Sequence, residues 1–307
     1  MVTKSKQNSE LVEKLAQQAD DMATSPSRSL WQDASRRFLR NKAAIGSLII
    51  LLLIVLFITF APMLLQFSYD DADFSMMTIA PDFESGHYLG TDSSGRDLLA
   101  RVAIGGRISL MVGVAGALIA VLIGTIYGAI SGYVGGVVDI VMMRILEILS
   151  SFPFMFFVIM LITLFGKNIF LIFIAIGLIS WLGLARVVRG QTLSLKNKEF
   201  IEAAIVCGVS RRQIIWKHII PNVIGIVVVY ASLEVPSFIL FESFLSFLGL
   251  GTQEPMSSWG SLLSDGAAQM EVAPWLLIFP AFFLCLTLFC FNFIGDGLRD
   301  ALDPKDK

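Results

Sequence analysis

The sequence predicts an all-α polytopic membrane protein with six transmembrane helices and both termini in the cytoplasm. Of its 307 residues, 55% are hydrophobic and 16% are charged, whereas soluble domains carry about 25% charged residues. The uncharged residues form long runs, and a helix needs about 20 such residues to cross a bilayer. Of 23 lysines and arginines, 19 fall on one side of the predicted spans. These residues accumulate in cytoplasmic segments, which sets the orientation.

The same composition excludes several other classes of protein. Apolar residues run continuously instead of alternating with period two, which excludes a transmembrane β-barrel. A formal net charge of −2 gives no reason to expect nucleic-acid binding. The cysteines form no CxxC pair, so we expect three free thiols. They are Cys207, Cys285 and Cys290.

Residues 1–42 predict a cytoplasmic N-terminal arm and no secretory signal, because a long polar stretch precedes the first apolar run. The spacing of Ser29 and Gln32 is typical of a capping box. The helix that it opens is amphipathic, and we expect it to lie on the membrane surface; a plain linker is the alternative. The residues expected at that surface are Leu30, Trp31, Ala34, Arg36, Arg37, Phe38 and Arg40.

The first span is predicted over 43–65, within a run of 27 uncharged residues. A periplasmic loop over 66–107 follows, with seven acidic residues against three arginines. This loop could meet a delivering protein or be simply solvated. The other five spans fill a transmembrane core, residues 108–296, and the second of the six ends near Gly132.

Small residues recur every four positions along the second span. Such residues make a smooth ridge that a neighbouring helix backbone can approach closely. We therefore expect this helix to be buried among others, and favour that interpretation over a ligand site. The residues are Gly116, Ala120, Gly124, Gly128, Gly132 and Gly136.

The remaining spans are predicted over 141–166, 168–185, 219–248 and 272–295. The third of the six is the least regular, since three charged residues precede it and would lie at the membrane edge. After the sixth, residues 297–307 predict a cytoplasmic tail.

Two glutamates interrupt the fifth span. Glu234 and Glu242 are eight positions apart, which places them within about 80° around a helix. An ionisable side chain at membrane depth is costly and usually faces a polar cavity or a partner charge. These residues are therefore candidates for lining a translocation pathway. The alternative places Glu242 at the outer interface and Glu234 protonated or hydrogen-bonded to a neighbouring helix.

The sequence predicts no catalytic residue, metal site or cofactor on this chain. Its only Gly-Lys pair, Gly166-Lys167, lacks the other residues of a P-loop. His87 and His218 are assigned to opposite sides of the membrane and cannot share a metal ion; each is expected to be solvated or interfacial. Energy for transport must then come from another chain or from an ion gradient.

The strongest functional signal is the cytoplasmic loop 186–220. Residues 198–206 predict a helix, and Gly208 suits a left-handed cap after it. Ser210 and Gln213 have the spacing of a second capping box. Two short helices joined by a glycine turn, with apolar residues among the charges, are typical of a docking element for a soluble partner.

This loop resembles the EAA loop of ABC importer permeases, in which a helix-turn-helix inserts into a groove of the ATPase subunit. The pattern is carried by Glu202-Ala203-Ala204, Gly208 and Ile220-Pro221. The family usually has Leu before the proline, so Ile220 is a departure. The resemblance implies ATPase docking by Glu202, Ala203, Ala204, Gly208, Ser210 and Pro221.

Three further segments, 89–97, 242–251 and 295–304, are similar to the peptide and nickel permease family. With its N-terminal arm and the aromatic run at 152–157, the chain is similar to the membrane subunits of oligopeptide importers. The resemblance covers the chain from about Leu30 onward. It implies the permease fold of a type I ABC importer in a bacterial inner membrane.

The resemblance also implies partners. A homologous second permease subunit, two ATPase subunits and a periplasmic peptide-binding protein would join this chain in the lipid bilayer. ATP and Mg²⁺ would bind to the ATPase subunits. Import of dipeptides or nickel is the alternative within the family, and a proton-coupled secondary transporter using Glu234 is the alternative outside it. A membrane enzyme is disfavoured, because no catalytic cluster is predicted on one side of the bilayer.

Overall fold

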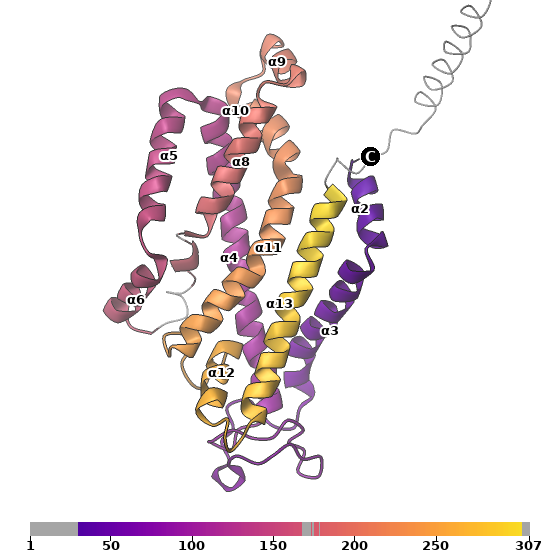
Figure 1. Ribbon diagram of the computed structural model, residues 1–307, viewed down its shortest axis with the longest axis vertical. Coiled ribbons are helices and arrows are strands. Elements are labelled where there is room, and N and C mark those ends of the chain that lie inside the picture. Colours follow the sequence, from indigo (N-terminus) through magenta and orange to yellow (C-terminus); the bar gives the residue numbers. More distant parts are fainter. Residues whose placement is uncertain (1–29, 168–172, 174, 178, 303–307) are drawn as a thin grey trace, which may run out of the picture.

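The computed structural model describes residues 30–167, 173, 175–177 and 179–302. Within these residues the regular elements are helices (Figure 1). In chain order they are α2 (Leu30–Arg40), α3 (Lys42–Leu64), η1 (Phe74–Met76), α4 (Leu98–Val134), α5 (Gly136–Ser151), α6 (Phe154–Phe165), α8 (Trp181–Leu195), α9 (Glu199–Val206), α10 (Arg211–Ile214), the π-helical turn η2 (Ile215–Ile219), α11 (Ile220–Phe247), α12 (Trp259–Ala268) and α13 (Trp275–Leu302).

Several of these helices can cross a bilayer, which confirms an all-α polytopic protein. Among the described residues, four continuous helices are long and apolar enough: α3, α4, α13 and the helix 211–247, which joins α10 to α11. Helices α5 and α6 would count as a fifth crossing if taken together. Seven of the 18 residues of the fourth expected span, 168–185, lie outside the described residues.

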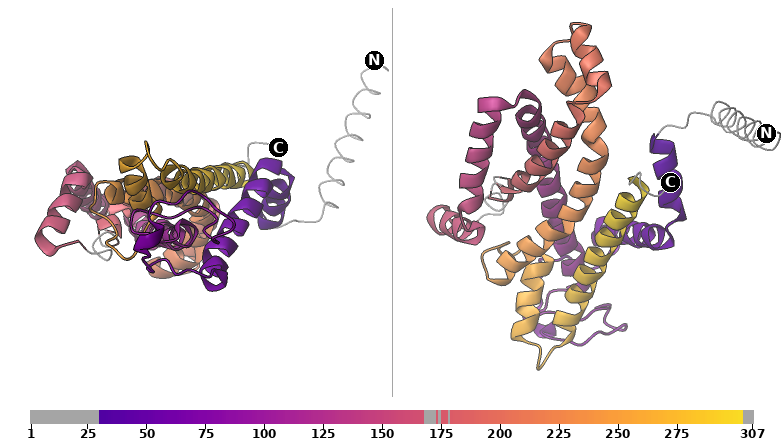
Figure 2. Two further views of the ribbon diagram at one scale, coloured as in Figure 1. Left: turned by 90° about the horizontal axis from the view of Figure 1, so that it is seen from below. Right: turned by 45° about the horizontal axis from the view of Figure 1, so that its top comes forward.

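The described ends of the chain lie at one end of the bundle. Figures 1 and 2 show α2 and the last turns of α13 at the same end as α9 and α10, with α12 and the loop before α4 at the opposite end. The loop 186–220 and both described ends therefore lie at the same end of the bundle.

Helix α4 packs closely against α8 along its ridge of small residues, which confirms the prediction for this helix. A Cβ atom on Gly124 would lie 2.9 Å from the carbonyl oxygen of Trp181, and one on Gly128 would lie 2.4 Å from that of Ala185. Only glycine allows such an approach. Gly136 differs from the prediction, because it begins α5 at φ +57° and faces open space.

Three helices extend beyond the predicted spans. Helix α4 begins at Leu98, so residues 98–107 are helical and not part of the outer loop. Helix α8 continues to Leu195 inside the predicted loop 186–220, and α13 continues to Leu302 inside the predicted tail. The charged residues in this stretch led the sequence analysis to begin the span only at residue 108. In the structure these side chains have partners within the protein; for example, Arg107 Nε donates to the carbonyl oxygen of Ile58 at 2.6 Å.

The third predicted span is not one straight helix. Helices α5 and α6 meet at 72°, with Phe152 and Pro153 between them in extended conformation. Proline has no N–H to donate and disfavours a helical conformation in the residue before it. The third predicted span, 141–166, is therefore broken at Phe152 and Pro153, with helical residues on both sides of the break.

Helix α2 packs on α13 more closely than expected for a helix lying on lipid. Ala34 is 7% exposed, and a Cβ atom on Gly297 of α13 would lie 3.3 Å from the ring of Phe38. These two predicted lipid-facing residues thus face protein, while Arg36 and Arg40 are exposed. The Ser29 capping box lies outside the described residues.

Candidate functional site

The two short helices of the loop 186–220, α9 and α10, are anchored to the long helices by apolar side chains. Ile201 and Ala204 of α9 are buried, and they share a cluster with Ile214 and Ile219. The cluster continues into α4, α8 and α11. Three long helices therefore pack against the helix pair through this cluster.

The turn between α9 and α10 has the predicted geometry. Gly208 adopts φ +77°, and the N–H of Val209 donates to the carbonyl oxygen of Ala204 at 3.0 Å. Ser210 and Gln213 cap α10 reciprocally, side chain to backbone, as a capping box. The structure therefore confirms the predicted helix, the glycine in the left-handed conformation and the second capping box.

The opposite side of this helix pair is exposed and partly apolar. Val206 is 87% exposed, and Phe200 and Trp216 are also exposed. Large apolar side chains on a surface beyond the membrane-spanning helices are typical of a protein interface. Of the residues predicted to dock the ATPase, Glu202, Ala203, Gly208, Ser210 and Pro221 are exposed. Ala204 lies on the anchoring side instead.

Helix α10 runs without interruption into a membrane span. The turn η2 has a π-helical hydrogen-bond pattern and connects α10 to α11, so that residues 211–247 form one helix of 37 residues. Pro221 lies in the first turn of α11, directly after η2. Single π-helical turns often mark functional positions in longer helices.

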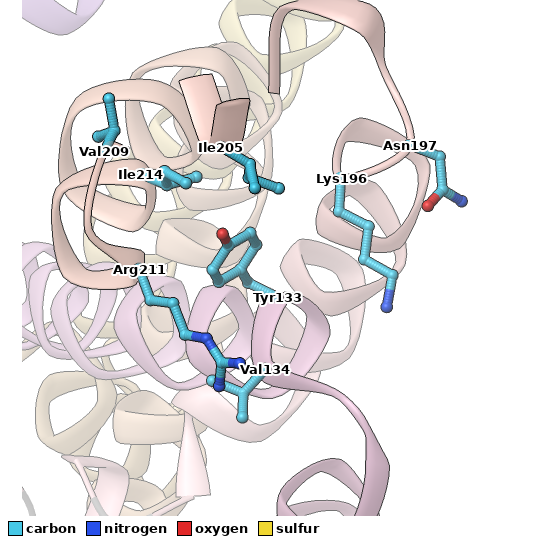
Figure 3. A pocket seen from close by; sticks show the side chains of 8 residues that line it. All are labelled: Tyr133, Val134, Lys196, Asn197, Ile205, Val209, Arg211 and Ile214. Carbon is cyan, nitrogen blue, oxygen red and sulfur yellow. The ribbon is translucent and has the colours of Figure 1, made fainter. Parts of the chain in front are cut away.

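A cavity of 340 Å³ lies beside this helix pair, at the end of α4. Figure 3 shows the ring of Tyr133 in its centre, with Ile205 and Ile214 on one side and the Arg211 side chain reaching toward Val134. The lining residues are Tyr133, Val134, Lys196, Asn197, Ile205, Val209, Arg211 and Ile214.

Near the same end, an ion pair joins α5 to α8. Arg189 Nε and Nη2 lie 2.5 Å from Oδ1 and Oδ2 of Asp139, and Ser131 Oγ of α4 donates to Asp139 Oδ1 at 2.5 Å. Sequence reasoning placed Asp139 at the membrane edge without a partner. Residues 50 positions apart give no pairing signal in a single sequence.

Glu242 is sealed inside the outer half of the bundle. It is 1% exposed and accepts hydrogen bonds from Ser109 Oγ at 2.8 Å and Ser246 Oγ at 2.6 Å. Ser109 Oγ also accepts from the backbone N–H of Trp259 at 3.2 Å. The carboxylate thus ties α11 to α4 and α12. Among the described residues its side chain is enclosed by protein groups, and its role in a translocation pathway stays a prediction.

Glu234 has a more open position on the same helix. It is half-buried and pairs with the hydroxyl of Tyr230, one turn earlier on α11. The Tyr230 hydroxyl also lies against α8, 2.2 Å from where a Cβ atom on Gly183 would be. The partner of Glu234 is therefore on its own helix and not on a neighbouring one.

The outer end carries a second buried network that the sequence did not reveal. Asp92 Oδ2 accepts from Arg96 Nε at 2.8 Å and from Arg101, and Arg96 Nη2 donates to Glu254 Oε1 at 2.6 Å. Burial alone would raise the pKa of Asp92. Two arginine charges, from Arg101 and Arg96, and hydrogen bonds from the backbone N–H groups of Arg96 and Ser94 outweigh this effect, so the pKa is lowered. The hydrogen bond from Arg96 likewise lowers the pKa of Glu254. The outer loop is thus locked onto the start of α4.

His87 belongs to this rigid outer part. It is 4% exposed, its Nδ1 lies 3.0 Å from Asp97 Oδ1, and its ring stacks on Phe67 with centroids 4.1 Å apart. Asp97 also caps α4 through the N–H of Ala100 at 2.8 Å. The expectation of a solvated or interfacial histidine was wrong for His87, which has a structural role.

Helix α12 completes the outer end, in a segment where no helix was predicted. Ser258 and Ser261 form its capping box, and Trp259 is fully buried, with its Nε1 donating to the carbonyl oxygen of Val102 at 3.0 Å. The Ser-x-x-Ser spacing is a weaker capping signal than one with Glu or Gln at the third position, which explains why it was missed.

Comparison with known proteins matches almost the whole chain. Residues 120–306 match the family described as binding-protein-dependent transport system inner membrane component. Residues 29–81 match the N-terminal TM domain of oligopeptide transport permease C. Together these matches confirm the resemblance inferred from the EAA-like loop.

Individual relatives agree with this assignment. The chain is 76% identical over 300 residues to the oligopeptide transport system permease protein OppC of Haemophilus influenzae, covering 98% of this chain and 96% of the relative. It is 72% identical to OppC of Escherichia coli K12 over 99% of each chain. It is 44% identical to the dipeptide transport system permease protein DppC of Bacillus subtilis, over 93% of this chain and 89% of the relative. The exposed helix pair α9–α10, the apolar helices and these matches show that the chain belongs to the family of binding-protein-dependent inner membrane transport components.

Proposed function

We propose that this chain is the membrane-spanning permease subunit of an ATP-driven importer that carries oligopeptides across a bacterial inner membrane. The high identity to OppC proteins over nearly the full chain supports the substrate class. The structural observation that carries the coupling role is the helix pair α9–α10, which is exposed on one face and anchored to three long helices on the other.

The proposed topology has six spans, with both termini and the loop 186–220 in the cytoplasm. The helices α3, α4, the pair α5–α6, α11 and α13 supply five of them. The sixth is the span predicted from the sequence over 168–185. Support comes from the lysine and arginine distribution and from the shared position of the described chain ends and α9–α10.

The proposed assembly contains a homologous second permease subunit, two ATPase subunits and a periplasmic peptide-binding protein. ATP and Mg²⁺ are bound by the ATPase subunits. This chain contributes part of the translocation path, for which Glu234 and Glu242 are the candidate residues. It also undergoes the conformational change that opens the path. When the ATPase subunits close on ATP, a displacement of α9–α10 travels along the continuous helix 211–247 and, through the shared apolar cluster, to α4 and α8.

Uptake by cells tests this function directly. Cells that lack this chain but keep every other subunit are given labelled tripeptides to pentapeptides, labelled dipeptides and nickel ions. Selective loss of the longer peptides, restored by the intact gene, is the expected result. Unchanged uptake of all three classes would contradict the proposal.

The dipeptide alternative is the second candidate, since the chain is also 44% identical to a DppC protein. Loss of dipeptide uptake alone would favour it over oligopeptides. A proton-coupled transporter predicts a different pattern, in which uptake persists without the ATPase subunits and collapses in Glu234→Gln.

A further inference from the structure

The cavity beside α9–α10 has walls from three separate parts of the chain. Tyr133 and Val134 come from the last turn of α4, Lys196 and Asn197 follow α8, and the remaining lining residues come from α9, α10 and the turn between them (Figure 3). A group bound there would contact all three parts at once. Its volume of 340 Å³ has room for one or two side chains.

The lining combines an apolar floor with a positively charged rim. Ile205, Val209 and Ile214 contribute aliphatic groups, whereas Lys196 and Arg211 carry the charges, and no lining residue is acidic. Among the described residues, neither of these cations forms an ion pair within 4.0 Å.

Nearby acidic groups do not neutralise this rim. Lys196 lies close enough to Asp139 to act on its charge, but both oxygens of Asp139 already bind Arg189. Glu199 and Glu202 of α9 are exposed and are not among the lining residues. A carboxylate on a short apolar stem therefore complements the cavity in both charge and polarity.

The cavity is continuous with the exposed apolar face of the helix pair. Ile205 lines the cavity and is also 54% exposed, and its neighbour Val206 is 87% exposed. An apolar surface bordering a charged pocket matches the usual anatomy of a protein interface, with an anchoring side chain inserted in the pocket. A small anion would leave the adjoining apolar surface uncovered.

We propose that this cavity receives an acidic side chain of the docked ATPase subunit, paired with Lys196 and Arg211 on its rim. This inference rests on the proposed function and extends it, because it names the chemistry of the partner residue. The contact joins the ATPase to the ends of α4 and α8 as well as to α9–α10. A closing ATPase therefore acts on α4 and α8 as well as on α9–α10.

Charge reversal in the assembled importer, purified in lipid nanodiscs, tests the pairing. Lys196→Glu and Arg211→Glu are compared with Arg40→Glu and Arg299→Glu, which reverse exposed cations that lie outside both the cavity and the helix pair α9–α10. Binding of labelled ATPase subunits is titrated after the bound ones are washed off. We expect the Kd to rise about tenfold for each cavity variant and to change less than about twofold for the controls. Equal effects of all four would overturn the proposal.

A photocross-linking amino acid in place of Val134 identifies the occupant, with the same amino acid in place of the exposed Val137 as control. We expect cross-links from position 134 to an ATPase segment that contains Asp or Glu. Changing that acid to Lys should restore binding to Arg211→Glu. Cross-links to lipid only, or the absence of such a rescue, would contradict the inference.

The two proposals fail in different ways. If Gly208→Asp releases the ATPase subunits but the cavity variants bind them normally, docking through α9–α10 stands and the acidic side chain in the cavity is wrong. If Gly208→Asp also retains them, the proposed docking itself is wrong.

Discussion

Arg189 of α8 holds Asp139 of α5 through two parallel contacts of 2.5 Å each. This pair matters for the position of α5, because Leu146 is the one fully buried residue of that helix. Val137 and Ile140 beside the pair are 75% and 65% exposed. A helix with so little buried surface depends on its polar contacts to stay in place.

We expect Asp139→Asn and Arg189→Gln to loosen α5, and the double variant to be no worse than either single one. Bidentate pairs between charged groups are stronger than ordinary hydrogen bonds, so the coupling energy should be about 1–2 kcal/mol. Thermal unfolding of the purified complex in detergent measures it. The matched control is Arg144→Gln with Glu147→Gln, an exposed pair on the same helix. Equal coupling in both cycles would contradict the prediction.

Replacing Glu242 with Ala should destabilise the outer end of the bundle by about 2–4 kcal/mol, because two buried serine hydroxyls lose their acceptor and a void remains. Glu242→Gln should cost less, since its amide oxygen still accepts one hydrogen bond. The control is Glu234→Ala, a half-buried glutamate on the same helix. Hydrogen exchange of α12 should rise in Glu242→Ala only; equal exchange in both alanine variants would argue against the role of Glu242.

Gly128→Ala should disrupt the contact between α4 and α8, because the new methyl group would lie 2.4 Å from the carbonyl oxygen of Ala185. Overpacking of this kind costs about 1–3 kcal/mol. Gly190→Ala on α8 is the control, since a Cβ atom there meets nothing within 4 Å. The yield of folded complex and its thermal midpoint should fall for Gly128→Ala alone. A normal midpoint for that variant would show that the helices can move apart without cost.

Stability should depend on pH through Asp92. Its pKa in the folded protein lies below the ordinary value of 3.8, so its contacts stabilise the fold at pH above 3.8 and are lost as the pH falls through the lowered pKa. Asp92→Asn should lower the thermal midpoint at neutral pH and make it less sensitive to acid below about pH 4. Asp71→Asn, at an exposed position of the same loop, should change neither. An unchanged acid profile in Asp92→Asn would exclude this origin.

Gly208→Asp should release the ATPase subunits while the chain still inserts in the membrane. The side chain meets no neighbour, but φ +77° is unfavourable for any residue other than glycine, and the α9–α10 angle would shift to relieve it. Gly208→Asn is the control, because Asn tolerates this conformation best among other residues. Co-purification of the ATPase subunits measures the effect. Equal retention by the two variants and the intact chain would rule out a role for the turn.

Much of the architecture could be predicted because it follows from local chemistry. Each feature can be recognised in one continuous stretch of sequence. Examples are the apolar runs of bilayer length, the lysines and arginines between them, and the Gly208 turn with its Ser210 cap. The close packing of α4 could likewise be predicted, since small residues at every fourth position favour close approach of another helix. None of these features requires knowing which segments meet in space.

The tertiary structure alone decided which charges are satisfied and where the helices end or break. The charges of Arg101 and Arg107 placed the start of the second span after them in the sequence analysis. In the structure Arg101 pairs with Asp92 and Arg107 donates to the carbonyl oxygen of Ile58, so α4 starts earlier. Glu242 meets its serine partner 133 positions away on another helix, and the cavity beside Tyr133 forms only when three distant segments converge. The physical reason is that the cost of burying a polar group depends on the partners that folding brings to it, and those partners are not neighbours in the sequence.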